Sequence, residues 1–78
     1  MIEWTDYDPE AVLAPGWYAL IYCWDPSEGA QVGCAYWDGA NWSDRYPIDK
    51  VSSQTFVTDD DAWKWAIDHD STAHSLST

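Results

Sequence analysis

Aromatic and aliphatic residues gather in two runs in the first half of the chain, and turn-forming residues separate the runs. Residues 17–24 read Trp-Tyr-Ala-Leu-Ile-Tyr-Cys-Trp, which is rich in the side-chain types that favour strands. Residues 25–29 place Pro and Gly where a turn needs them, and residues 30–37 form the second run. The pattern predicts two antiparallel strands, at residues 17–24 and 30–37.

A weaker pattern continues the predicted sheet. The Asp38-Gly39 pair is a strong hairpin signal, and it predicts a short third strand at residues 42–46. Together the three strands would form an antiparallel meander. Beyond them, Pro47 interrupts the pattern, and residues 47–57 read as an extended stretch with a fourth strand at residues 54–57.

The segment before the sheet is predicted to contain a short helix. Asp8 is a suitable N-cap residue, Pro9 suits the first helical position, and Glu10 suits the first turn. The Pro15-Gly16 pair would end this helix after one or two turns.

A second helix is predicted over residues 59–69. Thr58 is its expected N-cap residue, with Asp61 three positions later in an approximate capping box. Acidic side chains fill its first turn, where the helix dipole favours them. Its apolar residues follow the helical repeat and are expected to pack on the sheet; they are Trp63, Ala66 and Ile67.

These elements predict one acidic α+β domain over residues 1–70. Its fold would be a small antiparallel meander of three or four strands, with a short N-terminal helix and a C-terminal helix packed on the sheet. Residues 71–78 are small and polar, and they are predicted to form a flexible tail.

Seven Trp, five Tyr and one Phe give this 78-residue chain an unusually aromatic composition. Each large aromatic side chain can bury roughly 150–250 Å², so a compact core is attainable in a short chain. We expect Trp17 and Trp63 in the core. Exposure is more plausible for the Trp residues near segment ends, and the three candidate aromatic anchors for a partner are Trp24, Trp37 and Trp42.

Charge gives the second unusual feature, because 14 Asp and Glu stand against three Lys and Arg, a net charge of −11. Such a chain would be repelled by bare nucleic acid and by anionic membranes, so neither is an expected partner. The sequence contains neither a run near the ~20 apolar residues of a membrane span nor a recognisable signal peptide. A cytoplasmic location is therefore expected.

The two cysteines, Cys23 and Cys34, are expected to be reduced and buried in that location. A disulfide between them across the hairpin is the alternative.

Catalytic motifs are missing from the sequence. It contains no Gly-rich phosphate loop, no Cys or His pair at zinc spacing and no nucleophile elbow. Two carboxylates could form a glycosidase pair, but so small a sheet offers little cleft. The acidic run at residues 59–61 lacks the alternating ligands and Gly of a calcium loop. We therefore predict a binding protein rather than an enzyme, with no cofactor and no metal.

Acidic residues recur at every predicted turn and helix start. Carboxylates two residues apart on an extended chain are about 6.8 Å apart, on the scale of the phosphate spacing in nucleic acid. Turns and helix caps also favour Asp. That preference explains individual Asp positions, but it does not explain why the chain has so few Lys and Arg residues. The candidate partner-binding residues are Asp6, Asp8, Glu10, Asp25, Glu28, Asp38, Asp44, Asp59, Asp60 and Asp61.

Part of the chain resembles a family of small phage and prophage domains of unknown function. The matching residues lie between positions 15 and 42; they are Pro15-Gly16-Trp17-Tyr18, Leu20-Ile21-Tyr22, Ala35-Tyr36-Trp37-Asp38-Gly39 and Trp42. The resemblance implies a β-rich core and a phage origin, and it assigns no functional residues. The C-terminal helix departs from that family, in which a Trp-Pro ending is usual. By size and acidity the chain also resembles, as a class, the anti-CRISPR proteins.

The leading hypothesis is an acidic inhibitor that mimics nucleic acid and blocks a basic surface of a host defence complex, such as a CRISPR effector. Two alternatives stay open. Exposed Trp side chains with Asp and Asn41 could bind a carbohydrate or a proline-rich peptide, or the chain could be an accessory phage domain whose acidity serves only solubility. The chain could act as a monomer or as a homodimer.

Overall fold

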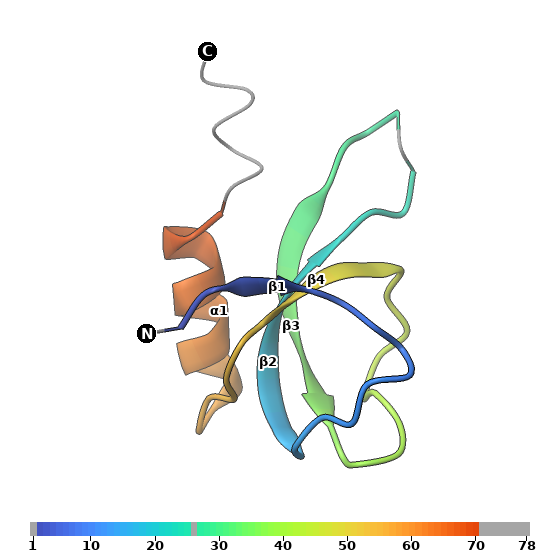
Figure 1. The fold of residues 1–78 in the computed structure, drawn as a ribbon. Coiled ribbons are helices and arrows are strands. Elements are labelled where there is room, and N and C mark those ends of the chain that lie inside the picture. The colour runs from blue at the N-terminus through green and yellow to red at the C-terminus, as the bar shows by residue number, and fades with distance from the viewer. Residues whose placement is uncertain (1, 26, 71–78) are drawn as a thin grey trace.

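The computed structural model describes residues 2–25 and 27–70, which form a small α+β domain. Its elements are β1 (Trp4–Asp6), β2 (Gly16–Tyr22), β3 (Gln31–Trp37), β4 (Ile48–Ser52) and α1 (Asp59–Asp68). The strands form an antiparallel sheet in the order β1-β4-β2-β3, with α1 against one side (Figure 1). The predicted α+β class and antiparallel sheet are confirmed. The predicted tail at residues 71–78 lies outside the described residues.

Strands β2 and β3 form the hairpin that the sequence predicts. They pair along their full length, from Gly16 opposite Trp37 to Tyr22 opposite Gln31. Gly16 begins β2 with a φ of +152°, and a Cβ atom there would come within 2.7 Å of the Thr55 side chain. The Pro15-Gly16 pair thus begins the strand, because glycine tolerates this backbone geometry and the close contact.

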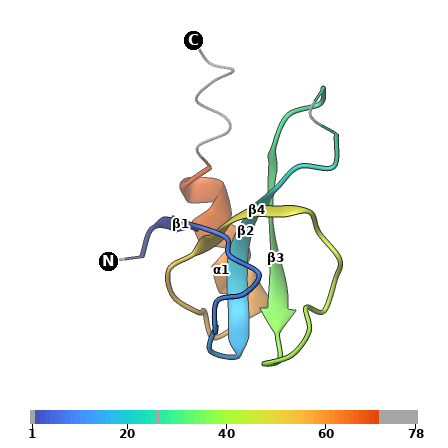
Figure 2. The same ribbon diagram turned by 45° about the vertical axis from the view of Figure 1, so that its right-hand side comes forward.

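The strand predicted at residues 42–46 is wrong. In that region the structure has one isolated bridge, between Trp37 and Trp42, and the next regular strand is β4. After this bridge the chain leaves the edge of β3 and crosses to the other side of β2, where Tyr22 pairs with Ile48 (Figure 2). The sheet is therefore not a simple meander. Likewise, residues 54–57 contribute only a bridge from Phe56 to Trp17, not a fourth strand.

A bulge explains why β4 is hard to recognise from its sequence. Lys50 pairs with Ile21, whereas Ile48 pairs with Tyr22, so Asp49 is an extra residue on this strand. Bulges of this kind turn a side chain out of the regular alternation. Asp49 is accordingly exposed, although β4 lies between two other strands.

The predicted N-terminal helix is not present in the structure. Residues 4–6 instead form β1, which pairs with β4, and the chain then turns at Asp8. The Asp8 carboxylate accepts a hydrogen bond from the Glu10 N–H at 2.9 Å, and the Asp8 carbonyl accepts one from the Ala11 N–H. An Asp–Pro sequence suits such a turn as well as a helix start, and no apolar helical face follows to favour the helix.

The sheet separates two packed regions. On one side, Tyr18, Leu20, Ala35 and Val51 form a buried cluster, and partly buried aromatic residues from the loops pack against it. On the other side lies α1, which packs on β2 and β3. Ser52 is buried to 99 %, and its hydroxyl accepts from the Ala19 N–H and donates to the Gln54 carbonyl.

Helix α1 begins as the sequence predicts. The Thr58 hydroxyl accepts a hydrogen bond from the Asp61 N–H at 3.1 Å, which confirms Thr58 as the N-cap residue. At the other end, the Trp4 indole N–H donates to the His69 carbonyl, and the Trp4 and Trp65 rings meet edge to face at 4.8 Å. Strand β1 thus holds the end of the helix.

The face of α1 that packs on the sheet differs from the predicted one. Ala62 and Ala66 are fully buried, whereas Trp63 and Ile67 are 43 % and 51 % exposed. The two alanines let the helix lie close to the sheet, and the larger Trp65 reaches Trp4 beside them. The prediction that Trp63 and Ile67 pack on the sheet is therefore wrong, and Trp63 is not a core residue.

Candidate functional site

The candidate acidic residues lie on the surface, but they do not form one continuous row. Every Asp and Glu in residues 2–25 and 27–70 is exposed except Asp70. Asp25 and Glu28 stand at the tip of the β2–β3 hairpin, and Asp38 follows β3 at the opposite end of that hairpin (Figure 1). Strands rise about 3.3 Å per residue, so the two ends are roughly 20 Å apart.

Among the candidates Asp6, Asp8 and Glu10, which alternate along the sequence, only Asp6 belongs to a strand. Its carboxylate pairs with the ammonium group of Lys50 on β4. This hydrogen-bonded pair lowers the pKa of Asp6 and raises that of Lys50. This ion pair joins β1 to β4.

Several candidate carboxylates also fix the local backbone. The Asp38 carboxylate accepts hydrogen bonds from the N–H groups of Asn41 and Ala40, at 2.7 and 2.8 Å, and these bonds lower its pKa. Asp25 accepts one from the Ser27 N–H, with the same direction of pKa shift. These residues stay charged at neutral pH, and their preference for turns accounts for their positions.

Acidic residues from two segments that are far apart in the sequence converge near β3. Asp44 follows Ser43, whose N–H donates to the Tyr36 carbonyl, and Asp59 and Asp60 begin α1 soon after the chain bridges to Trp17. Trp17 and Tyr36 are paired in the hairpin register. The loop with Asp44 and the start of α1 therefore both lie beside this pair. We call the surface formed by Asp44, Asp59 and Asp60 the acidic patch.

The acidic patch affects the pKa of the Cys34 thiol. Its pKa is raised, first by partial burial and then by the negative charges of Asp59, Asp44 and Asp60. Cys34 and Cys23 are both half-buried, and the structure has no disulfide between them. The pKa of this thiol therefore depends on carboxylates from two separate segments.

Removing charge from the acidic patch is expected to lower the pKa of Cys34, because nearby negative charge disfavours the thiolate. Alkylation rates measured against pH in a Cys23→Ser background would give this pKa. We expect a midpoint above the usual value of about 8.5, and a lower midpoint in the Asp44→Asn, Asp60→Asn double variant. An unchanged midpoint in that variant would show that the carboxylates do not converge on Cys34.

An aromatic hollow of about 450 Å³ lies under the loop that follows β3. Two predicted anchors, Trp37 and Trp42, line it, with ring centroids 5.1 Å apart. Both are partly buried, and their indole N–H groups donate to the Leu13 carbonyl and the Tyr7 hydroxyl, at 3.1 and 3.2 Å. The remaining lining residues are Tyr7, Ala40, Asn41, Asp44, Arg45 and Tyr46.

Tyr7, Arg45 and Tyr46 also line this hollow, although no sequence pattern indicates them. In the strand predicted at residues 42–46, Arg45 and Tyr46 would point to opposite faces of a sheet. In the structure they lie on the crossing loop instead. The predicted grouping of Trp side chains with Asp and Asn41 is nevertheless present, because Asn41 and Asp44 line the hollow beside the two Trp residues. Trp24, the third predicted anchor, is 61 % exposed.

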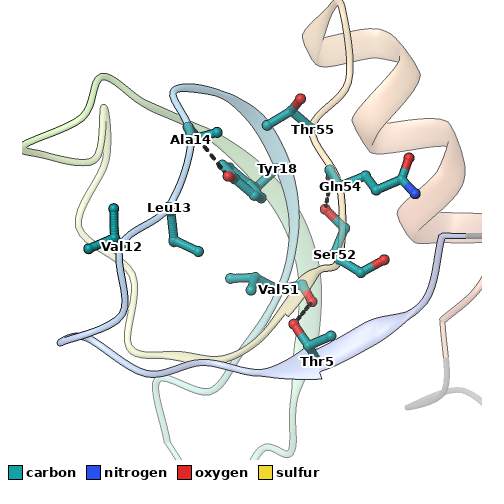
Figure 3. A pocket seen from close by; sticks show the side chains of 10 residues that line it. Thr5, Val12, Leu13, Ala14, Tyr18, Val51, Ser52, Gln54 and Thr55 are labelled. Carbon is teal, nitrogen blue, oxygen red and sulfur yellow. Dashed lines mark hydrogen bonds between the residues drawn. The ribbon is translucent and has the colours of Figure 1, made fainter.

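A second hollow, of about 520 Å³, opens between β1, the segment before β2 and the segment after β4 (Figure 3). Two of its hydroxyl groups already donate within the protein, Tyr18 to the Ala14 carbonyl and Thr5 to the Val51 carbonyl. Its lining contains no charged side chain. This hollow therefore offers little chemistry for recognising a ligand.

Two further searches of the described residues were negative. No three or more His, Cys, Asp or Glu side chains there come together in a group that could hold a metal ion. No helix in the same part of the chain combines the length and apolar character that crossing a bilayer requires.

Comparison with known proteins gives no relative: no family model, no curated protein and no solved structure matches the chain. The resemblance to small phage domains therefore stays a prediction, and the argument for function rests on the residues of this chain.

Proposed function

We propose that this protein acts by binding, and that it blocks a basic nucleic-acid-binding surface of a host defence complex, with a CRISPR effector as the foremost candidate. The supporting observation is the imbalance of exposed charge. The described carboxylates are almost all exposed, and the chain has only three Lys and Arg against 14 Asp and Glu, with Lys50 already paired to Asp6. A basic groove that normally holds phosphates would accept such a surface and release its counterions.

The acidic patch is the part of the surface best suited to begin this contact. Asp44, Asp59 and Asp60 come from a loop and a helix start that the sheet holds together, and Tyr36 beside them is 37 % exposed. Carboxylates around an aromatic side chain combine long-range attraction with a short-range anchor. In this proposal the protein works in the cytoplasm of the host cell, with Asp25, Glu28 and Asp38 extending the charged surface.

The test is competition with nucleic acid for a purified CRISPR effector–guide complex. Target DNA carrying a fluorescent label would be titrated with the protein at low salt, over a panel of effector types. We expect displacement of the DNA from at least one effector. Failure to displace DNA from any of them would refute a CRISPR effector as the target, and failure on other basic nucleic-acid-binding proteins of host defence would refute the mimicry.

A further inference from the structure

Five aromatic side chains, four of them partly buried, lie between the tip of the β2–β3 hairpin and the aromatic hollow. The rings of Trp24, Tyr22 and Tyr46 contact one another, with centroid separations of 4.5 to 6.4 Å. Tyr46 also lines the hollow, beside Trp42 and Trp37. We call these five side chains the aromatic strip. It begins at the most exposed Trp among the described residues and ends in a cavity.

The rings of the strip are inclined to one another. The planes of Tyr22 and Trp24 meet at 76°, those of Trp24 and Tyr46 at 52°, and those of Trp37 and Trp42 also at 52°. Such rings do not provide one flat platform. A sugar ring stacks best on a flat aromatic face, whereas a polyproline II segment docks in an aromatic-lined hollow such as the one at Trp37, Trp42 and Tyr46.

Two hydrogen-bond donors of the strip are unoccupied. In the described ranges, neither the Trp24 indole N–H nor the Tyr46 hydroxyl has a hydrogen-bond partner, whereas the indole N–H groups of Trp37 and Trp42 are bonded within the protein. Burial, followed by the charge of Asp44, raises the pKa of Tyr46, so its hydroxyl stays protonated. A polyproline II helix has no internal hydrogen bonds, so its carbonyl groups can accept from such donors.

Charge at the ends of the strip favours a basic partner. Asp25 directly follows Trp24, and Glu28 lies in the same hairpin tip. In the hollow, Asp44 is balanced by Arg45, so the excess of negative charge lies at the Trp24 end. An Arg or Lys next to a proline-rich segment would meet the carboxylates there, and an Arg could also stack on the Trp24 ring.

We propose that the aromatic strip binds a proline-rich peptide segment that carries Arg or Lys at one end. The prolines would lie in the aromatic hollow beside Tyr46 and Trp42, and the basic residue would lie at Trp24 and Asp25. This binding does not depend on the proposed competition with nucleic acid, although the two surfaces share Asp25, Glu28 and Asp44.

The test uses the whole protein and a labelled peptide of eight prolines with two arginines at one end, followed by fluorescence anisotropy. We expect saturable binding with a Kd below about 1 mM. Trp24→Ala should weaken it about tenfold or more, as expected for an aromatic hot spot. Trp63→Ala is the matched control, because Trp63 lies on α1, on the side of the sheet opposite the strip, and is 43 % exposed; it should leave the affinity unchanged.

A second variant keeps the proposal falsifiable if Trp24→Ala perturbs the hairpin. Tyr46→Phe removes only the hydroxyl, and the loss of one hydrogen bond should weaken binding about two- to tenfold. The proposal is overturned if the peptide shows no binding up to about 1 mM, or if Trp24→Ala and Trp63→Ala weaken it equally. Binding of a neutral hexasaccharide in place of the peptide would also overturn it.

Discussion

Replacing Leu20 by alanine is expected to lower the free energy of unfolding by about 2–5 kcal/mol. Leu20 is fully buried and packs in the cluster with Tyr18, Ala35 and Val51. Its partner in the hairpin is Gly33, which has no side chain to fill the space left behind. A domain of this size has a total stability of only several kcal/mol, so the loss is a large fraction of the whole.

Urea unfolding followed by circular dichroism would measure this loss. Val12→Ala is the matched control, because Val12 is 100 % exposed and its truncation should change the free energy by about 0.5 kcal/mol or less. A similar, small effect at both positions would contradict the description of the core.

Removing two charges from the acidic patch is expected to weaken binding to the target by about 2- to 30-fold. The variant is Asp44→Asn with Asp60→Asn, and neither side chain accepts a hydrogen bond that holds the described backbone. Exposed charge pairs contribute roughly 0.2–1 kcal/mol each, which sets the range. The measurement is the concentration of protein that displaces half of the labelled DNA from the effector.

The control variant removes the same net charge from elsewhere. Asp49→Asn with Asp68→Asn changes two exposed carboxylates, on the β4 bulge and in the last turn of α1. It should weaken binding less than the patch variant does. If the two variants have equal effects, the acidic patch has no special role. If neither variant has any effect, the result supports the alternative in which acidity serves only solubility.

Short sequence patterns predicted the β2–β3 hairpin and the start of α1 correctly. The hairpin follows from two aromatic runs around a Pro- and Gly-containing turn, and the N-cap of α1 follows from Thr58 and the acidic first turn. The exposure of Trp24 followed from its place at a segment end. Each of these features is determined by residues that are close together in the sequence.

Long-range pairing could not be predicted in the same way. Strand β4 carries charges at Asp49 and Lys50, and it becomes a central strand only because of the bulge and because β1 supplies Asp6 as a partner for Lys50. The Asp8-Pro9 pair fits both a turn and a helix start, and pairing of β1 with β4 decides between them. The buried face of α1 was predicted only in part: Ala66 is buried as predicted, but Ala62 takes the place predicted for Trp63 and Ile67.

The sequence predicted which residues belong to the acidic patch, but not how they are arranged in space. The sequence pointed to Asp44 and to Asp59 and Asp60 individually, but their convergence near Cys34 depends on the loop that crosses from β3 to β4. The same loop brings Tyr46 beside Trp24. No local pattern signals a crossing of this kind, because it is determined by which strands pair.

The central claim is that exposed negative charge drives binding to a basic nucleic-acid-binding surface. The most direct test is the affinity of the protein for the effector that it inhibits, measured by calorimetry from about 50 mM to about 200 mM salt. The charge-driven mechanism predicts that the affinity falls at least about tenfold over this range, and that the Asp44→Asn, Asp60→Asn variant shows a shallower salt dependence. An affinity that stays the same from low to high salt would contradict the claim.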